Sequence, residues 1–169
     1  MRIIGIDPGY AIVGFGVVDY IDGKFSVKDF GAITTDKDTP FPKRLCEIYE
    51  DYCQILDTWK PNALSIERLY FTNNQKTGID VAQARGIIIM AAAQRGIEIN
   101  EYTPLQVKQA VVGYGQAVKK QVQEMTRQLL GLSAVPKPDD TADALAMAIC
   151  HAHCSASGIT GLASALKKI

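Results

Sequence analysis

Two hydrophobic patterns follow one another along the chain. The N-terminal part holds short apolar segments rich in β-branched and aromatic residues, and turn residues such as Asp7-Pro8-Gly9 and Asp22-Gly23 separate them. Such segments are typical of strands. We therefore predict three strands, joined by short turns into an antiparallel meander, at Arg2–Ile6, Ile12–Tyr20 and Phe25–Thr34.

The pattern then changes to alternating helices and strands. Apolar side chains recur three or four positions apart in Pro42–Trp59, which is helical spacing, and Lys60-Pro61 ends the helix. The same reasoning predicts strands at Ala63–Ile66 and Ile97–Tyr102, and helices at Gln75–Arg95, Thr103–Val112, Lys119–Leu130 and Asp139–Ala156. This order predicts an α/β fold in which helices flank a mixed five-stranded sheet.

Composition limits the class of protein. The chain has 169 residues, 47% of them hydrophobic and 21% charged, which fits one globular domain and argues against disorder or a fibre. The longest apolar run, Gly86–Ala93, is far shorter than the ~20 residues of a membrane helix. Asp7 interrupts any signal-peptide core. We therefore expect a cytoplasmic protein without a membrane partner. The small, polar segment 157–169 predicts a flexible tail.

Charge and cysteine content add little. The formal net charge is zero, so the total does not indicate nucleic-acid binding, although a local basic patch suffices for phosphate contacts. The run Cys150-His151-Ala152-His153-Cys154 invites a zinc hypothesis. Neighbouring residues on a helix point in different directions, and zinc sites usually draw on two separated pairs of ligands. We interpret the cysteines, including Cys46 and Cys53, as reduced thiols.

Carboxylates occur where apolar elements meet loops. Asp7 follows the first predicted strand, Glu67 follows the fourth, and Asp139, Asp140 and Asp143 open the last helix. Carboxylates at the ends of core strands point into one crevice. Such a cluster repels itself unless cations lie between its members, and hard oxygen ligands favour Mg²⁺ or Mn²⁺.

Other interpretations of these residues remain open. Each carboxylate alone fits a turn, a strand end or a helix cap, and on a helix both Asp139 and Asp140 share a face with Asp143. Glycines surround the first carboxylate, and we expect them to let a phosphate backbone approach the sheet, although tight hairpins use glycine too. They are Gly5, Gly9, Gly14 and Gly16.

Five motifs in order resemble one family. They are Ile4-Gly5-Ile6-Asp7-Pro8-Gly9, Ser65-Ile66-Glu67-Arg68, Ala82-Gln83-Ala84-Arg85-Gly86, Val107-Lys108-Gln109-Ala110-Val111-Val112-Gly113 and Asp140-Thr141-Ala142-Asp143-Ala144-Leu145-Ala146. The set is similar to the RuvC family of Holliday-junction resolvases, from Arg2 to about Cys154. The first motif alone is weak, because related nucleases and some kinases share it.

The resemblance implies a ribonuclease-H-like fold of the retroviral-integrase type, with a nuclease domain over residues 1–156. It implies a homodimer that nicks four-way DNA junctions symmetrically on strands of like polarity, leaving 5′ phosphate and 3′ hydroxyl ends, in recombination and repair. It also implies two Mg²⁺ ions per subunit, with Mn²⁺ as a substitute, and association with the RuvA–RuvB branch-migration complex. The helix Gln75–Arg95 resembles the dimerisation helix of the family.

The same resemblance implies roles for single residues. Asp7, Glu67, Asp140 and Asp143 match the metal ligands, and the pattern favours Asp140 over Asp139. Lys108 and Lys119 match lysines associated with DNA contact and catalysis, and Lys120 beside Lys119 resembles an added phosphate contact. Tyr70 matches an aromatic position that stacks on junction bases.

Three alternative functions compete with this one. A related nuclease that processes RNA shares the Asp7-Pro8-Gly9 turn, and a junction-binding protein without catalysis shares the binding surface. A sugar-kinase-like ATPase also opens with a glycine-rich acidic strand, but it needs two such domains and 169 residues supply one.

Overall fold

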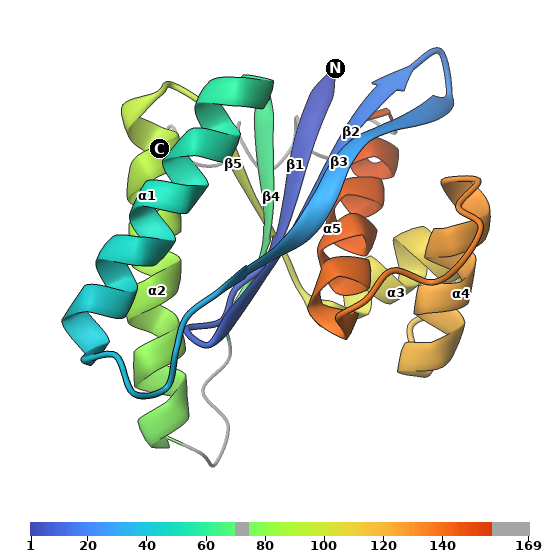
Figure 1. The fold of residues 1–169 in the computed structure, drawn as a ribbon. Helices are drawn as coiled ribbons and strands as arrows, with labels where there is room; N and C mark the ends of the chain where they lie inside the picture. The colour runs from blue at the N-terminus through green and yellow to red at the C-terminus, as the bar shows by residue number, and fades with distance from the viewer. Residues whose placement is uncertain (70–74, 157–169) are drawn as a thin grey trace, which may run out of the picture.

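A five-stranded mixed sheet lies between two layers of helices (Figure 1). The structure is a computed structural model that describes residues 1–69 and 75–156. In the sheet the strand order is β3-β2-β1-β4-β5, and the first three strands form the predicted antiparallel meander, whereas β4 and β5 run parallel to β1. The strands are β1 (Arg2–Asp7), β2 (Ile12–Ile21), β3 (Lys24–Thr34), β4 (Ala63–Glu67) and β5 (Glu98–Tyr102).

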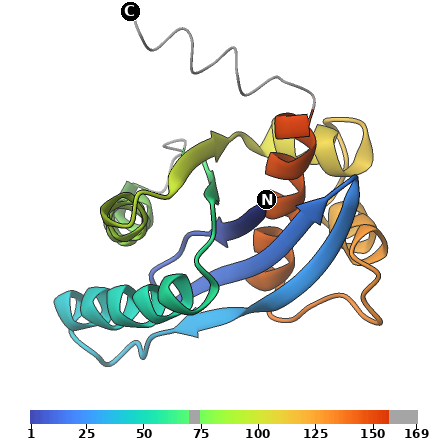
Figure 2. The ribbon, with the colours of Figure 1, turned by 90° about the horizontal axis from the view of Figure 1, so that it is seen from above.

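The helices divide between the two faces of the sheet, as the view from above makes clear (Figure 2). One face is covered by α1 (Phe41–Trp59) and α2 (Gln75–Gln94). The other is covered by α5 (Asp139–Ala156), against which α3 (Pro104–Val112) and α4 (Lys119–Leu129) pack from outside. The predicted α/β class is confirmed, and every predicted element is present with ends that agree within one residue.

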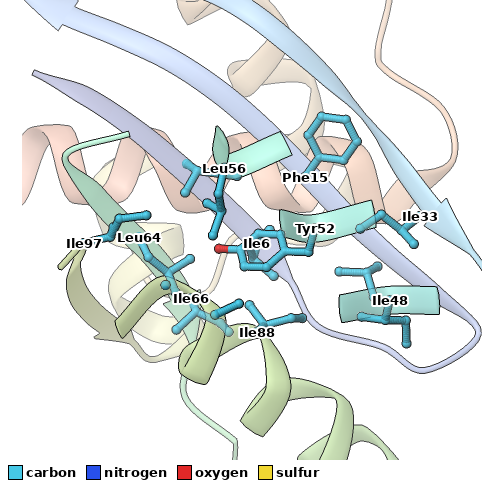
Figure 3. Close-up of a cluster of buried hydrophobic side chains, with 14 of the residues drawn as sticks. Ile6, Phe15, Ile33, Ile48, Tyr52, Leu56, Leu64, Ile66, Ile88 and Ile97 are labelled. Carbon is cyan, nitrogen blue, oxygen red and sulfur yellow. The ribbon is translucent and has the colours of Figure 1, made fainter. Parts of the chain in front are cut away.

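Alternation along the strands decides which residues form the main core. Even-numbered residues of β1 and β4 point toward α1 and α2, because successive side chains of a strand face opposite sides. Figure 3 shows Ile6, Leu64 and Ile66 from these strands packed against Tyr52 of α1 and Ile88 of α2, all fully buried. Each such side chain stabilises the fold by about 1.5–3 kcal/mol, so this face anchors the sheet.

Small residues let α5 approach the opposite face very closely. A Cβ added at Gly5 would lie 2.0 Å from the main-chain oxygen of Ala144, and one added at Gly14 would lie 2.0 Å from that of Asp140. On β4, the buried Ser65 hydroxyl donates a 2.6 Å hydrogen bond to the Met147 main-chain oxygen. These contacts dock the N-terminal half of α5 onto β1, β2 and β4.

The expectation that the glycines admit a phosphate backbone is therefore wrong. Gly5, Gly14 and Gly16 face α5, and the space above them is filled by that helix. Gly9 serves its own turn, since a Cβ there would lie 2.1 Å from the main-chain oxygen of Ile12. Sequence reasoning found the glycines around Asp7 but expected a DNA backbone above them, where the structure places helix α5.

Two predictions fall on residues outside the described part of the chain. They are the stacking role of Tyr70 and the flexible tail over residues 157–169. Within residues 1–69 and 75–156, none of the helices combines the length and the apolar character that crossing a membrane requires.

Candidate active site

Strand alternation and register bring Asp7 and Glu67 together. Both continue the odd-numbered series, in which Ile3, Gly5 and Ser65 face α5, so both carboxylates point to that side of the sheet. The parallel strands pair Ile6 with Ile66, which sets Asp7 beside Glu67 at the carboxyl ends of β1 and β4. The structure extends both strands by one residue to include these carboxylates.

The N-terminal end of α5 brings Asp140 and Asp143 to this edge. Because Asp140 packs its main chain on Gly14 and Met147 accepts the bond from Ser65, the intervening Asp143 lies over β1 and β4. Asp143 lines the same cleft as Asp7 and Glu67. Asp140 is not among the residues that line the cleft, but its charge acts on Asp7.

Asp139 points to a different set of partners. Its carboxylate lies 2.6 Å from the Lys137 ammonium and 3.7 Å from that of Lys119. Lys137 thereby lowers the pKa of Asp139 through a hydrogen bond. The spacing of the helix left Asp139 and Asp140 equivalent, whereas the docking of α5 separates them.

Two lysines complete the cleft from the outer helices. Thr103 and Gln106 form a capping box at the start of α3, and this helix places Lys108 on the wall of the cleft. Lys119, the first residue of α4, lies 2.8 Å from the Asp143 carboxylate. Lys120 is exposed and is not among the lining residues.

The cleft has a volume of about 230 Å³ and one apolar wall. Sequence reasoning missed this wall, although its residues lie within one turn of the predicted lysines and of Asp143 on the same helices. It consists of Pro104, Val107, Val122, Ala146 and Met147. Such a wall lowers the local dielectric constant and strengthens the interactions of charged groups beside it.

Burial and mutual repulsion perturb the acidic groups. Burial is the largest cause that raises the pKa of Asp7 to about 8, followed by the charges of Asp143, Glu67 and Asp140. The pKa of Glu67 is also raised, by burial and then by Asp143. The hydrogen bond to Asp143 raises the pKa of Lys119 and keeps it charged. A cation is therefore favoured in this cleft.

The chemical nature of the candidate ligands suits a hard divalent ion. All four candidate ligands are carboxylates, which Mg²⁺ and Mn²⁺ prefer, and the charges of three of them add to burial in raising the pKa of Asp7. Within the described residues, no three acidic, histidine or cysteine side chains already form a shell around a common point. The ammonium of Lys119 provides the nearest positive charge to Asp143.

The cysteine and histidine run of α5 has structural contacts. His151 is buried and lies 2.8 Å from the Tyr102 hydroxyl, and His153 lies 2.9 Å from the Ala110 main-chain oxygen. Cys150 is buried, and Cys46, Cys53, Cys150 and Cys154 are all free thiols. The two histidines bond different elements, so they do not converge on one point.

The strand order, with carboxylates at the ends of β1 and β4 and at the start of α5, defines a ribonuclease-H-like α/β protein with an acidic cleft. The family profile described as crossover junction endodeoxyribonuclease RuvC matches residues 3–151. The chain belongs to the RuvC family.

Individual relatives agree with this assignment. The crossover junction endodeoxyribonuclease RuvC of Ruminiclostridium cellulolyticum is 55% identical over 151 residues, which span 89% of this chain and 91% of the relative. The corresponding protein of Fusobacterium nucleatum is 49% identical across 100% of this chain and 90% of its own length.

Solved structures agree as well. Thermus thermophilus RuvC in complex with Holliday junction substrate matches with a TM-score of 0.89 and 34% identity, over 94% of this chain and 96% of that one. The yeast mitochondrial Holliday junction resolvase matches at 14% identity with a TM-score of 0.67, over 92% of this chain and 79% of its own. The second likeness concerns the fold alone.

Proposed function

We propose that this protein is a metal-dependent endonuclease that resolves four-way DNA junctions in recombination and repair. It cuts two strands of like polarity by symmetric nicks and leaves 5′ phosphate and 3′ hydroxyl ends. The observation that carries the proposal is the convergence of Asp7, Glu67, Asp143 and two lysines on one cleft, in a chain of the RuvC family.

The residues of the cleft divide the chemical work. Asp7, Glu67, Asp140 and Asp143 would hold two Mg²⁺ ions, for which Mn²⁺ would substitute, and the bound ions would supply activation of a water and stabilisation of charge on the leaving oxygen. Lys108 stabilises charge that develops on the scissile phosphate. Lys119 pairs with Asp143 and lines the same cleft, so it is also placed to contact the scissile phosphate.

The test of the activity compares substrates. We expect an end-labelled synthetic four-way junction to receive paired symmetric nicks in Mg²⁺ and none in EDTA, while a linear duplex and a structured RNA of matched length stay intact. Degraded RNA together with an uncut junction would indicate the RNA-processing nuclease instead. Tight junction binding without cleavage in any metal would indicate a binding protein.

Carboxylate variants test the ligand set. Glu67→Gln should abolish cleavage and retain junction binding, because the amide keeps the shape of the side chain and removes the charge. Asp140→Asn should reduce cleavage far more than Asp139→Asn, since the charge of Asp140 acts on Asp7 whereas Asp139 pairs with Lys137. Equal losses in these two neighbours would refute the assignment of Asp140.

Lysine variants separate chemistry from binding. Lys108→Met and Lys119→Met should lower kcat on the junction by about 100-fold or more, as the loss of a group that stabilises the transition state does. Lys120→Met, on the exposed side of the same turn, should weaken binding alone and reduce the salt slope of the binding constant by about 1. A drop in kcat for Lys120→Met would contradict this division.

The exposed face of α2 supports a homodimer. Ile79 and Met90 are 52% and 46% exposed and lie eleven residues apart, hence on one side of the helix. Between them Gly86 is exposed, and a Cβ there would meet nothing within 4 Å. This flat apolar stripe suits the same stripe of a second copy related by a twofold axis.

A charge on this stripe tests the dimer. We expect Met90→Asp to shift the protein to monomers in sedimentation equilibrium and to replace paired nicks by single ones. Leu129→Asp, at an exposed apolar position of α4, is the control and should remain dimeric. Monomeric wild-type protein that still cuts both strands would refute the role of α2.

Family membership also supports two roles that the described residues do not address. We propose that Tyr70 stacks on unpaired junction bases, so Tyr70→Ala should weaken junction binding and Tyr70→Phe should not. We also propose that the protein acts with the RuvA–RuvB complex, which co-sedimentation on a shared junction would detect. Equal behaviour of the two Tyr70 variants would remove the stacking role.

A further inference from the structure

Arg85 joins helix α2 to the end of the strand that carries Glu67. Its Nε donates a 3.1 Å hydrogen bond to the main-chain oxygen of Glu67, and its Nη2 forms an ion pair with Glu101 of β5. The Arg85 side chain is only 14% exposed. Although Arg85 belongs to one of the five motifs, the proposed chemistry leaves it without a role.

The bond lies where β4 loses one of its two strand neighbours: Glu67 still pairs with Tyr102 of β5, whereas the pairing with β1 ends at Ile66. Glu67 is the last residue of β4, and the next residue, Arg68, donates its main-chain N–H to Tyr102 and then leaves the sheet. The guanidinium of Arg85 thus satisfies the Glu67 carbonyl at a position where the pairing with β1 has ended. Glu101 holds this guanidinium in place and also lies 3.7 Å from Arg68.

The direction of a side chain depends on the main chain that bears it. Without this bond the main chain of Glu67 would keep its pairing with β5 but lose its link to α2, and the Glu67 carboxylate would be directed less firmly toward Asp7 and Asp143. Metal ligands and catalytic groups need placement within a few tenths of an ångström, and the residues that orient them affect metal affinity or activity by about 10–100-fold.

We infer that Arg85 is a positioning residue that sets the placement of the Glu67 carboxylate from helix α2. The inference rests on the proposed function, in which Glu67 holds a divalent ion. Since the exposed stripe of the proposed dimer lies on the same helix, Arg85 also connects the position of that interface to the acidic cleft.

Arg95, the residue directly after α2, offers a matched control. Arg95 forms a bidentate ion pair with Asp57 of α1, at 2.7 and 2.9 Å, and donates a bond to the Ala91 main-chain oxygen. Arg85→Gln and Arg95→Gln therefore each remove one ion pair and one main-chain hydrogen bond. Only the first of these variants releases Glu67.

The experiment measures metal binding and cleavage separately on the full chain. Calorimetric titration with Mg²⁺ alone should give a Kd about 10-fold higher for Arg85→Gln than for wild type, and kcat on the junction should fall by about 10-fold or more. Junction binding in EDTA should stay within about two-fold, because Arg85 is not proposed to contact DNA. Arg95→Gln should leave the Mg²⁺ affinity within about two-fold.

Conservative variants separate positioning from general stability. Arg85→Lys keeps the positive charge but cannot bridge Glu67 and Glu101 at once. Its Mg²⁺ affinity should therefore lie between those of Arg85→Gln and wild type. If Arg85→Gln does not fold, Glu101→Gln loosens the same guanidinium from its other side and should weaken Mg²⁺ binding in the same direction.

The outcomes distinguish the two proposals. Wild-type protein that binds Mg²⁺ yet cuts no junction would refute the proposed function, while the Mg²⁺ affinities would still decide the role of Arg85. Equal losses in Arg85→Gln and Arg95→Gln would overturn the inference, as would an unchanged Mg²⁺ affinity in Arg85→Gln or Glu101→Gln. A wild type that binds no Mg²⁺ would overturn both.

Discussion

Replacement of Asp7 by asparagine should make the metal-free protein more stable while it abolishes cleavage. The carboxylate of Asp7 is desolvated and lies close to the charges of Asp143, Glu67 and Asp140. An asparagine amide has the same shape, carries no charge and can donate to the remaining carboxylates. The variant therefore relieves a strain that the wild type tolerates for the sake of metal binding.

The magnitude follows from the shift in pKa. The pKa of Asp7 rises from 3.8 to about 8 in the folded protein, so the folded state holds a proton that the unfolded state has lost over that range. Stability from this group is fully present below pH 3.8 and is lost as the pH rises to about 8. At pH 7 the loss is at most about 4 kcal/mol, at about 1.4 kcal/mol per pH unit.

We expect about half of that loss to be recovered by the substitution, because the pKa of the neighbouring Glu67 is raised as well and interacting carboxyl groups share protons. A gain of about 2 kcal/mol raises the melting temperature of a domain of this size by about 4–8 °C. Saturating Mg²⁺ should reverse the order, since an ion present at about 100 times its Kd stabilises the wild type by about 2.7 kcal/mol.

Urea denaturation in EDTA, repeated from pH 5 to pH 9, measures the effect. The unfolding free energy of wild type should fall relative to that of Asp7→Asn as the pH rises, and Mg²⁺ should stabilise wild type alone. Asp38→Asn, at an exposed position before α1, is the control and should follow wild type. An Asp7→Asn protein no more stable than wild type at pH 8 in EDTA would refute the reasoning.

Three further predictions concern the packing of α5. Ser65→Ala should lower the unfolding free energy by about 0.5–1.5 kcal/mol, because it removes a buried hydrogen bond to the Met147 carbonyl. Thr58→Ala, which removes an exposed bond to Gln54, should change it by less than about 0.5 kcal/mol in the same urea titration. Gly14→Ala should lower the unfolding free energy by more than about 3 kcal/mol and remove most of the cleavage activity, since its Cβ would clash with the Asp140 main chain. The control Gly31→Ala should lower the unfolding free energy clearly less, because its Cβ meets only the Phe15 ring at 3.1 Å. Equal urea midpoints for the two variants would disprove the docking argument. Burial lowers the pKa of His151 below 6.5, so the unfolded state gains a proton first and this residue removes stability as the pH falls below about 6.5. With Asp7→Asn as the common background, His151→Gln should abolish the fall in unfolding free energy below about pH 6.5. The same pH dependence with and without His151→Gln would contradict this role of His151.

Local patterns were sufficient for most of the fold. The change from β-branched segments to helical spacing placed every element within one residue, because both periods arise from backbone geometry that neighbouring residues determine. That Asp7 and Glu67 face the same side depends in addition on the register of β1 and β4, which pairs Ile6 with Ile66. The ordered motifs supplied the family. Of the six residues to which the resemblance assigned metal binding or catalysis, all except Asp140 line the cleft.

Contacts between distant residues were decided only by the tertiary structure. The role of Gly5 and Gly14 depends on how closely α5 docks, and the choice between Asp139 and Asp140 depends on the rotation of that helix about its axis. The contact of Arg85 with the main chain of Glu67 spans eighteen residues and two elements. No local rule reaches that far, because a residue type specifies what a side chain can bond and the packing of elements specifies which partner it meets.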